Sequence, residues 1–259
     1  MTNDIVLFRT HKFNNIIDNN LKHLKKSKKQ VEVLFDYSNS SKQDNCVNFS
    51  LEDIKASGYS IGNISQLYRT FMNNPDRSLI KRFPTLRMQQ IWYNIGHYIV
   101  LFYDKYPNYK YYWSVEYDVK FKGDWDDFFS IYNNSKIDYL GVDIQETKID
   151  DTKGYWGLFD FDVPYKKRLR CFGTIQRLSN RLLKAVSDEL KQGRHTYFEQ
   201  LFPSVAKHYN YSVKDLNEIA VNKTGQQIYT GSTMTYEDIT LNQYVHLANS
   251  KNKLFHPVR

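Results

Sequence analysis

The chain has 259 residues, of which 41% are hydrophobic and 16% aromatic, and it carries a formal net charge of +8. This length allows one large or two small domains, and the hydrophobic content is sufficient for a folded core. The basic balance favours polyanionic partners, namely nucleic acid, an anionic membrane surface or a phosphorylated substrate. Cys46 and Cys171 lie far apart without metal-ligand spacing, which argues against a disulfide scaffold or a zinc site and favours a reducing compartment.

The first residues, MTNDIVLFRTH, lack the basic segment and the long apolar run of a signal peptide. No apolar run in the chain reaches the ~18 residues that a membrane-spanning helix needs. A cytoplasmic location is therefore expected.

Two short apolar strands with a helix between them open the chain. Residues 4–8 (DIVLF) and 31–35 (VEVLF) have the composition of strands, and residues 13–26 place apolar side chains on one helical face. This order and spacing predict a βαβ unit with parallel strands. A lysine cluster near the end of the helix is interpreted first as its solvated end, and alternatively as a patch that holds the protein peripherally against anionic lipid at the inner face of a membrane. The cluster consists of Lys22, Lys25, Lys26, Lys28 and Lys29.

The turns after these two strands carry the first candidate binding residues. Asp36 ends the second strand, where an acid in a nucleotide-binding α/β sheet can bond a ribose hydroxyl or a base. Arg9, Thr10 and His11 form the first strand-to-helix turn, which suits a phosphate or a base and is equally compatible with an ordinary polar loop. No GxGxxG follows the first strand, so a dinucleotide cofactor is not supported.

Two helices are predicted next. Residues 50–56 begin at a serine cap and have Asp53 three residues later, which resembles a capping box. Residues 85–103 place apolar side chains at helical spacing and are predicted as one continuous helix, with Pro107 ending the segment. The aromatic residues on this helix are interpreted as core.

The most informative stretch is residues 111–125, YYWSVEYDVKFKGDW. Its aromatic and β-branched start predicts a buried central strand. Glu116 and Asp118 lie near the carboxyl end of this strand, where open α/β sheets bind ligands. Adjacent carboxylates repel each other, and Mg²⁺ or Mn²⁺ would relieve that repulsion, although a solvated strand end explains the spacing equally well. Asp124 is predicted to cap a helix at residues 125–132.

Further elements are predicted after this stretch. Residues 137–144 and 170–175 are expected to be strands, and residues 177–192 a helix that ends at glycine. Residues 145–167 form a long segment of the kind that is usually functional or disordered. Within it, Tyr155 and Trp156 lie beside glycines, which suits stacking on a sugar or a base.

Two late residues are candidates for chemistry. Glu199 is predicted at a helix start, where it is either a general base or an acid that complements the helix dipole. His256 is a candidate ligand for a metal such as Mn²⁺ or a hydrogen-bond donor to phosphate, although such a histidine is more often a bystander. Residues 211–259 are predicted as short strands and loops. We expect residues 255–259 to matter more for activity than for stability, because a polar tail buries little core.

Together these residues resemble a known family. The run YYWSVEYDVKFKGDW, with Glu116-x-Asp118 in place of Asp-x-Asp, resembles the acidic motif of GT-A-type glycosyltransferases, which bind a nucleotide-diphosphate sugar and usually need Mn²⁺ or Mg²⁺. The resemblance implies Asp118 as a metal ligand and Glu116 as a ribose, sugar or second-sphere contact. Glu199, in HTYFEQLFPS, looks like the acceptor base of inverting members, and His256 looks like the late histidine that completes the metal or pyrophosphate site.

The resemblance implies a single GT-A-like, Rossmann-like α/β domain over residues 1–259, with a central, mostly parallel sheet flanked by helices. Residues 1–120 would form the nucleotide-binding half and residues 121–259 the acceptor-binding half. The implied activity is metal-dependent transfer of a hexosyl or related group from a nucleotide-diphosphate sugar to a saccharide or lipid-linked hydroxyl, as in polysaccharide biosynthesis. The donor-binding candidates are Arg9, Thr10, His11, Asp36 and Glu116, and the acceptor-binding candidates are Tyr155 and Trp156.

Two other functions are compatible with the sequence. A non-enzymatic nucleic-acid-binding protein accounts for the charge and the 21 tyrosines, but it leaves Glu116 and Asp118 unexplained, so we expect no nucleic-acid partner. A nucleotidyltransferase or metal-dependent phosphodiesterase would use the same acids for a different reaction. Because glutamate replaces the first aspartate of the motif, Asp138 and Asp143 on the following strand are alternatives to Glu116.

Overall fold

The computed structural model describes residues 3–62, 85–147, 167–224, 227–230, 233–246 and 251–259. A seven-stranded sheet runs through its centre in the order β3-β2-β1-β4-β7-β6-β8. Neighbouring strands are parallel except for β7, which is antiparallel to both β4 and β6. The strands are β1 (Asp4–Thr10), β2 (Gln30–Asp36), β3 (Val47–Phe49), β4 (Tyr111–Glu116), β6 (Tyr139–Thr147), β7 (Arg168–Ser179) and β8 (Val213–Asp215).

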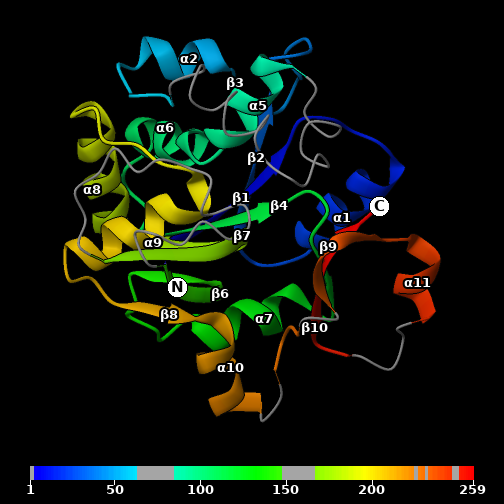
Figure 1. Ribbon diagram of the computed structural model, residues 1–259. Helices are drawn as coiled ribbons and strands as arrows, with labels where there is room; N and C mark the ends of the chain where they lie inside the picture. Colours follow the sequence, from blue (N-terminus) through cyan, green and yellow to red (C-terminus); the bar gives the residue numbers. More distant parts are fainter. Residues whose placement is uncertain (1–2, 63–84, 148–166, 225–226, 231–232, 247–250) are drawn as a thin grey trace.

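Helices cover both faces of this sheet (Figure 1). One face carries α2 (Leu51–Ala56), α5 (Leu86–Tyr93), α6 (His97–Lys105), α8 (Asn180–Lys191) and α9 (Phe198–His208). The other carries α1 (Asn15–Leu24), α7 (Trp125–Tyr132) and α10 (Leu216–Thr224). This arrangement confirms the predicted α/β class with a mostly parallel sheet flanked by helices.

Strand β1 separates the two hydrophobic cores. Ile5 and Leu7 belong to the core under α6, α8 and α9, whereas Val6 and Phe8 belong to the core under α1 and α7. Successive side chains of a strand point to opposite faces, so a continuous apolar run is what a strand buried on both faces requires. The predicted βαβ unit is confirmed, since β1 and β2 pair in parallel on either side of α1.

The prediction of one continuous helix at residues 85–103 is wrong. Two helices occupy the segment, because α5 ends at Asn94 and α6 begins after Gly96. The Asn94 amide donates to the Gln90 carbonyl at 2.8 Å, and asparagine and glycine are both weak helix formers. A Cβ on Gly96 would lie 2.8 Å from Phe198 Cβ, so a glycine is needed where this break approaches α9.

The predicted helix at residues 177–192 starts later than its pattern indicates. Arg177 and Leu178 extend strand β7, where they pair with β4 and β6. Ser179 then caps α8 by accepting a hydrogen bond from the Leu182 N–H group, which fixes the helix start at Asn180.

A second sheet of three strands, in the order β5-β10-β9, lies beside the first. Its strands are β5 (Lys120–Lys122), β9 (Met234–Ile239) and β10 (Lys253–Val258). The expectation that residues 255–259 form a polar tail with little core is wrong. Leu254 and Phe255 are fully buried and Val258 is 1% exposed, because β10 lies between β5 and β9.

Two helices interrupt the segment that the sequence predicted as strands and loops. Helix α10 covers one face of the main sheet, and α11 (Leu241–His246) connects β9 to β10. Among the described residues, no helix is long and apolar enough to span a membrane. Cys46 and Cys171 are both free thiols.

Candidate functional site

The central strand β4 ends at the first of the two candidate acids. Glu116 is its last residue, and Asp118 follows in the turn beyond it. The Tyr117 N–H group donates to the Arg9 carbonyl at 3.0 Å, and the Val258 N–H group donates to the Asp118 carbonyl at 2.9 Å. The backbone of this turn is therefore fixed by the ends of β1 and β10.

A histidine from the second sheet completes a three-residue cluster. His256 Nε2 lies 3.5 Å from Glu116 Oε2 and 3.4 Å from Asp118 Oδ1. One ligand atom from each of these residues lies within 4.8 Å of the others, which is close enough for all three to hold one metal ion. Strand β10 thus brings His256 to the acid pair across about 140 residues of sequence.

The charges of the cluster depend on one another. Burial alone would lower the pKa of His256, but Asp118 and Glu116 outweigh it and raise that pKa to about 9. Burial would raise the pKa of Asp118, yet His256 and Arg259 outweigh it and lower that pKa below its ordinary value. A proton on His256 and a divalent cation are alternative ways to balance these carboxylates.

The donor set fits such a cation. Asp118 Oδ1 is buried and faces His256 Nε2 at 3.4 Å, a contact that balances its charge only while the imidazole is protonated. An imidazole that instead offered Nε2 to a cation would leave this buried oxygen without a donor, which is costly, and direct coordination would remove that cost. Carboxylate oxygens and a neutral imidazole nitrogen suit Mn²⁺, and the two carboxylates also suit Mg²⁺. Glu116, Asp118 and His256 are therefore a candidate metal centre.

Arg259 supports the cluster from its outer side. Its Nη2 atom lies 3.2 Å from Asp118 Oδ2, and its Nη1 atom lies 3.0 Å from Asp238 Oδ1. Arg259 was not among the predicted site residues. Only its position close to the candidate His256 in the sequence could have indicated a role.

Arg9 links this cluster to Glu199. Its Nη2 atom lies 3.3 Å from Glu116 Oε1 and donates to the Gly173 carbonyl at 2.9 Å. The Gly173 N–H group donates to Glu199 Oε1 at 3.1 Å. Arg9 is only 3% exposed, and no described residue accepts a hydrogen bond from its Nε or Nη1 atoms. A buried guanidinium with two such donors suits an anionic ligand.

Gly173 is the point on β7 where these groups meet. A Cβ there would lie 2.5 Å from a Phe198 ring carbon and 3.2 Å from Glu199 Cγ. Only a glycine lets the first turn of α9 approach the strand so closely. As predicted, Glu199 lies in that first turn, and it is 6% exposed.

The remaining donor-site candidates lie along the same edge of the sheet. Thr10 ends β1, and its hydroxyl donates to the Lys12 carbonyl at 2.6 Å. The His11 ring packs edge-on against Tyr117 with ring centroids 5.1 Å apart. Tyr117 stands between Glu116 and Asp118 in the sequence, so the β1 turn lies beside the acid pair. Burial lowers the pKa of His11, and the nearby charges of Asp36, Asp118 and Glu116 act against that shift.

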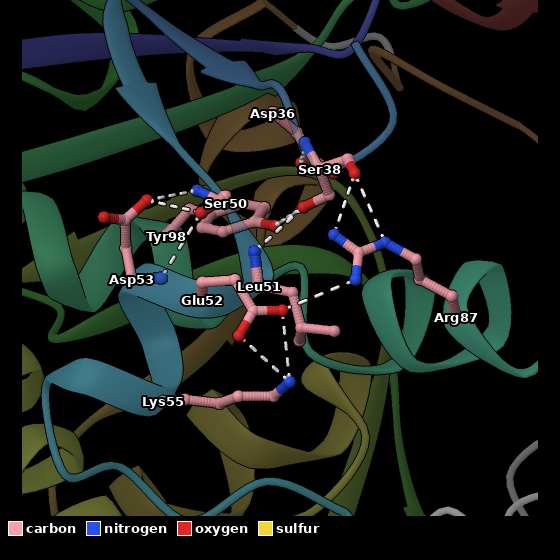
Figure 2. Close-up of polar contacts among 9 residues, drawn as sticks. All are labelled: Asp36, Ser38, Ser50, Leu51, Glu52, Asp53, Lys55, Arg87 and Tyr98. Carbon is pink, nitrogen blue, oxygen red and sulfur yellow. Dashed lines mark hydrogen bonds and ion pairs between the residues drawn. The ribbon is translucent and has the colours of Figure 1, made fainter. Parts of the chain in front are cut away.

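Asp36 is held by a polar network at the end of β2 (Figure 2). Its Oδ1 atom accepts from the Ser38 N–H group at 2.9 Å, and the Ser38 carbonyl accepts from Arg87 Nη2 at 2.9 Å. The Ser38 hydroxyl accepts from the Leu51 N–H group at the start of α2. Burial and the nearby charge of Asp36 raise the pKa of Tyr98 well above its ordinary value, so this phenol remains protonated.

The two alternatives to Glu116 are placed differently. Asp138 precedes β6 at the opposite edge of the sheet. Its carboxylate accepts hydrogen bonds from Arg181, Ser179 and Ser212. It is therefore not part of the cluster. Asp143 lies further along β6, outside the cluster, at a cavity of about 480 Å³. Tyr155 and Trp156 lie outside the described residues.

This cavity adjoins the candidate metal centre through Phe172, whose ring centroid lies 5.1 Å from that of His256. Among the described residues, its polar lining is acidic or neutral and includes neither lysine nor arginine. The other lining residues are Val142, Asp215, Asn217, Glu218, Gln227, Tyr229, Thr230 and Met234. A hydroxyl-rich ligand suits this lining better than a phosphate does, because carboxylates accept hydrogen bonds and repel anions.

No protein-family model and no curated protein sequence matches the chain. Similar solved structures include a glycosyltransferase involved in the glycosylation of the major capsid of PBCV-1, with 8% identity over 98% of this chain and 91% of that one (TM-score 0.39). Mouse xyloside xylosyltransferase 1 has 10% identity over 98% of this chain and 97% of its own (TM-score 0.39).

A third similar structure is that of a protein from Bacillus anthracis assigned as a glucose-1-phosphate thymidylyltransferase, in complex with sucrose. It has 9% identity over 82% of this chain and 85% of that one (TM-score 0.40). Similarity at these levels carries no argument about function. Any proposal therefore depends on the geometry of the site.

Proposed function

We propose that this protein is a GT-A-like glycosyltransferase, which moves a sugar from a nucleotide-diphosphate donor to a hydroxyl of a saccharide or lipid-linked acceptor and depends on Mn²⁺ or Mg²⁺. One observation carries the proposal. Glu116, Asp118 and His256 offer three ligand atoms within 4.8 Å of one another where the central strand β4 ends. In open α/β sheets, ligands bind outside the carboxyl ends of the strands.

The donor would bind where β1 and β4 end. When bound, the divalent cation stabilises the negative charge that develops on the leaving nucleoside diphosphate. Arg9 would add a buried positive charge, since its Nε and Nη1 groups have no described acceptor. Thr10, His11 and Asp36 remain proposed contacts to the nucleotide, because all three lie at the ends of β1 and β2.

The acceptor would approach from the side of β7. Glu199 is proposed to take the proton from the acceptor hydroxyl as that hydroxyl attacks the anomeric carbon. Arg9 and Gly173 connect Glu199 to Glu116, which supports placing the base beside the donor. The cavity lined by Phe172 and Asp143 would hold the acceptor's sugar.

A titration of the purified protein with uridine and guanosine diphosphates, with and without Mn²⁺, tests the donor site. We expect calorimetry to detect Mn²⁺-dependent nucleotide binding in the natural protein and not in Asp118→Asn. Asp127→Asn makes the same chemical change at an exposed position of α7 and should bind as the natural protein does. Unchanged binding by Asp118→Asn would show that the metal assignment is wrong.

A product assay then distinguishes the reaction classes. Incubation with a panel of nucleotide sugars should release nucleoside diphosphate and form a new glycosidic bond. Release of pyrophosphate from a nucleoside triphosphate and a sugar phosphate would identify a nucleotidyltransferase instead. Binding of oligonucleotides without turnover would favour the nucleic-acid-binding alternative.

A further inference from the structure

Helix α11 exposes an apolar side that the fold does not cover. Leu241 is 42% exposed and Val245 is 57% exposed, and side chains four residues apart lie on the same face of a helix. Tyr244 packs inward on Phe255, with ring centroids 5.2 Å apart. The helix is therefore attached to β10 through Tyr244, while Leu241 and Val245 remain in contact with solvent.

Lysines lie directly beside this helix. The ammonium groups of Lys120 and Lys122, both on β5, lie 5.0 and 5.3 Å from the Tyr244 ring centroid. Lys122 Nζ also lies 3.5 Å from the Tyr244 carbonyl. Strand β5 thus places two positive charges at the base of the exposed apolar side.

The end of α1 extends the basic surface. The His23 ring packs on that of Trp125 at the start of α7, with ring centroids 6.4 Å apart, and the Lys28 N–H group donates to Asp126 Oδ1 at 2.7 Å, so the end of α1 lies against the turn that follows β5. Lys26 is exposed, and so is Lys22 one turn earlier. Three acids, Asp124, Asp126 and Asp127, lie at the start of α7 and keep their negative charge, but they are outnumbered by six lysines, namely Lys22, Lys25, Lys26, Lys28, Lys120 and Lys122.

We infer that these elements form a docking surface for an anionic lipid bilayer. The docking surface consists of Leu241, Val245, Lys120, Lys122, Lys22 and Lys26. Peripheral proteins bind such bilayers by combining an inserted apolar side with lysines that meet anionic head groups, each lysine contributing about 1 kcal/mol. This inference does not depend on the proposed reaction.

Two observations select a bilayer over other occupants. A second copy of this chain would bring the same lysines against one another, and like charges repel. A nucleic acid would account for the lysines but would leave Leu241 and Val245 exposed to water. A bilayer with anionic head groups accounts for both parts of the docking surface.

Sedimentation with vesicles tests the inference on the full chain. One set of vesicles is phosphatidylcholine alone, and in the other about a third of the lipid is phosphatidylglycerol. We expect the protein to sediment with the anionic vesicles alone and to be released as the salt concentration rises. Lack of binding to anionic vesicles at low salt would overturn the inference.

Matched variants locate the contact. The double variant Lys22→Gln, Lys26→Gln should weaken vesicle binding by roughly tenfold or more, because each lysine near an anionic surface contributes about 1 kcal/mol to binding. Lys105→Gln with Lys207→Gln removes the same charge from exposed positions of α6 and α9 and should bind within about twofold of the natural protein. Equal losses of vesicle binding in the two variants would show that binding depends on net charge alone, and would overturn the inferred docking surface.

The apolar part needs its own variant. Leu241→Ser with Val245→Ser should weaken vesicle binding while leaving the melting temperature unchanged, because both side chains are exposed. Unchanged vesicle binding in this variant would show that α11 is not the contact. If the lysine variant instead lost retention on single-stranded DNA and kept vesicle binding, the surface would be a nucleic-acid site and the inference would be wrong.

Discussion

Single side chains at the carboxyl edge are held in a row of alternating charge. The acids Glu116 and Asp118 each contact His256, and each also contacts an arginine. The histidine on one side and an arginine on the other balance the charge of each carboxylate. The two acids can therefore lie close together in a largely buried place, where an acid without such partners would be costly to ionise. Arg9 extends the row through Gly173 toward Glu199.

Replacing Glu199 tests the proposed base. We expect Glu199→Gln to lower turnover by roughly 10²–10⁴-fold, the usual range for loss of a general base. Donor binding should survive, because the carboxamide keeps the shape of the side chain and can still accept from the Gly173 N–H group. Turnover and calorimetric donor binding are measured on the same preparation.

Glu32→Gln is the control for this variant, since Glu32 lies near the start of β2, away from the strand ends that carry the proposed site. Near-normal turnover in Glu199→Gln would show that Glu199 is not the general base and only complements the dipole at the helix start. Loss of donor binding as well would place it in the donor site. Product stereochemistry is read in parallel, because an enzyme that retains the anomeric configuration does not need this base.

At the scale of elements, Asp138 joins three segments at the edge opposite the candidate metal centre. Its carboxylate accepts from Arg181 Nη2 of α8 at 2.6 Å, from the Ser179 hydroxyl at the end of β7 at 2.9 Å, and from the Ser212 hydroxyl before β8 at 2.8 Å. Burial alone would raise the pKa of Asp138, but these partners outweigh it and lower that pKa to about 2.

Asp138→Asn should therefore destabilise the protein in a pH-dependent way. At pH 7 we expect a loss of roughly 1.5–3 kcal/mol in the free energy of unfolding, the range for hydrogen bonds to a charged group. A pKa lowered on folding means that the stabilisation is present above the ordinary value of 3.8 and is lost as the pH falls through about 2. Urea unfolding of both proteins at several pH values measures the difference.

Asp44→Asn is the control, because Asp44 is an exposed aspartate. It should unfold as the natural protein does at every pH. A difference between natural protein and Asp138→Asn that stays constant from pH 7 to below pH 2 would show that the effect is not one of ionisation.

Strand β10 contributes buried side chains to the core as well as His256 to the candidate metal centre. Phe255→Ala should lower the free energy of unfolding by about 3–5 kcal/mol, the usual cost of emptying a phenylalanine site in a core. Val245→Ala removes an exposed apolar side chain from the neighbouring helix α11 and should change the free energy of unfolding very little. Thermal and urea unfolding distinguish these outcomes, and an equally stable Phe255→Ala would mean that β10 is not packed as described.

For the whole molecule, local patterns predicted several elements of the first half. The βαβ unit, the capping box at Ser50 and the start of α7 at Asp124 each depend on a few neighbouring residues, and each is present. The break at Gly96 was missed because the apolar spacing continues through the two weak helix formers Asn94 and Gly96, and because the approach of α9 that requires a glycine there is remote in sequence.

Long-range pairing also limits what could be predicted of the candidate site. Glu116 and Asp118 could be selected from their spacing, and His256 from the chemistry of its imidazole and from the family resemblance. Neither route predicted Arg259, because its contact with Asp118 exists only once β10 lies between β5 and β9. The link from Arg9 through Gly173 to Glu199 likewise depends on how β1, β7 and α9 come together.

The stability of the whole protein should respond to the metal and nucleotide together. At concentrations about 100-fold above the dissociation constant, a ligand specific to the folded state stabilises it by about 2.7 kcal/mol. For a chain of this size we expect the melting temperature to rise by roughly 5–10 °C with Mn²⁺ and a nucleoside diphosphate, and the chelator EDTA should reverse the rise. A similar rise with an oligonucleotide alone, unaffected by EDTA, would contradict the proposed site.

The distance in sequence between Asp118 and His256 has a consequence during synthesis. During synthesis, residues 116 and 118 leave the ribosome well before residue 256, because the chain is made from its N-terminus. Until β10 has been made and has paired with β5, the two acids lack their imidazole partner, and the cluster of Glu116, Asp118 and His256 is incomplete. An incompletely translated chain is therefore without the three-residue cluster, and the proposed metal centre forms only once translation has passed His256.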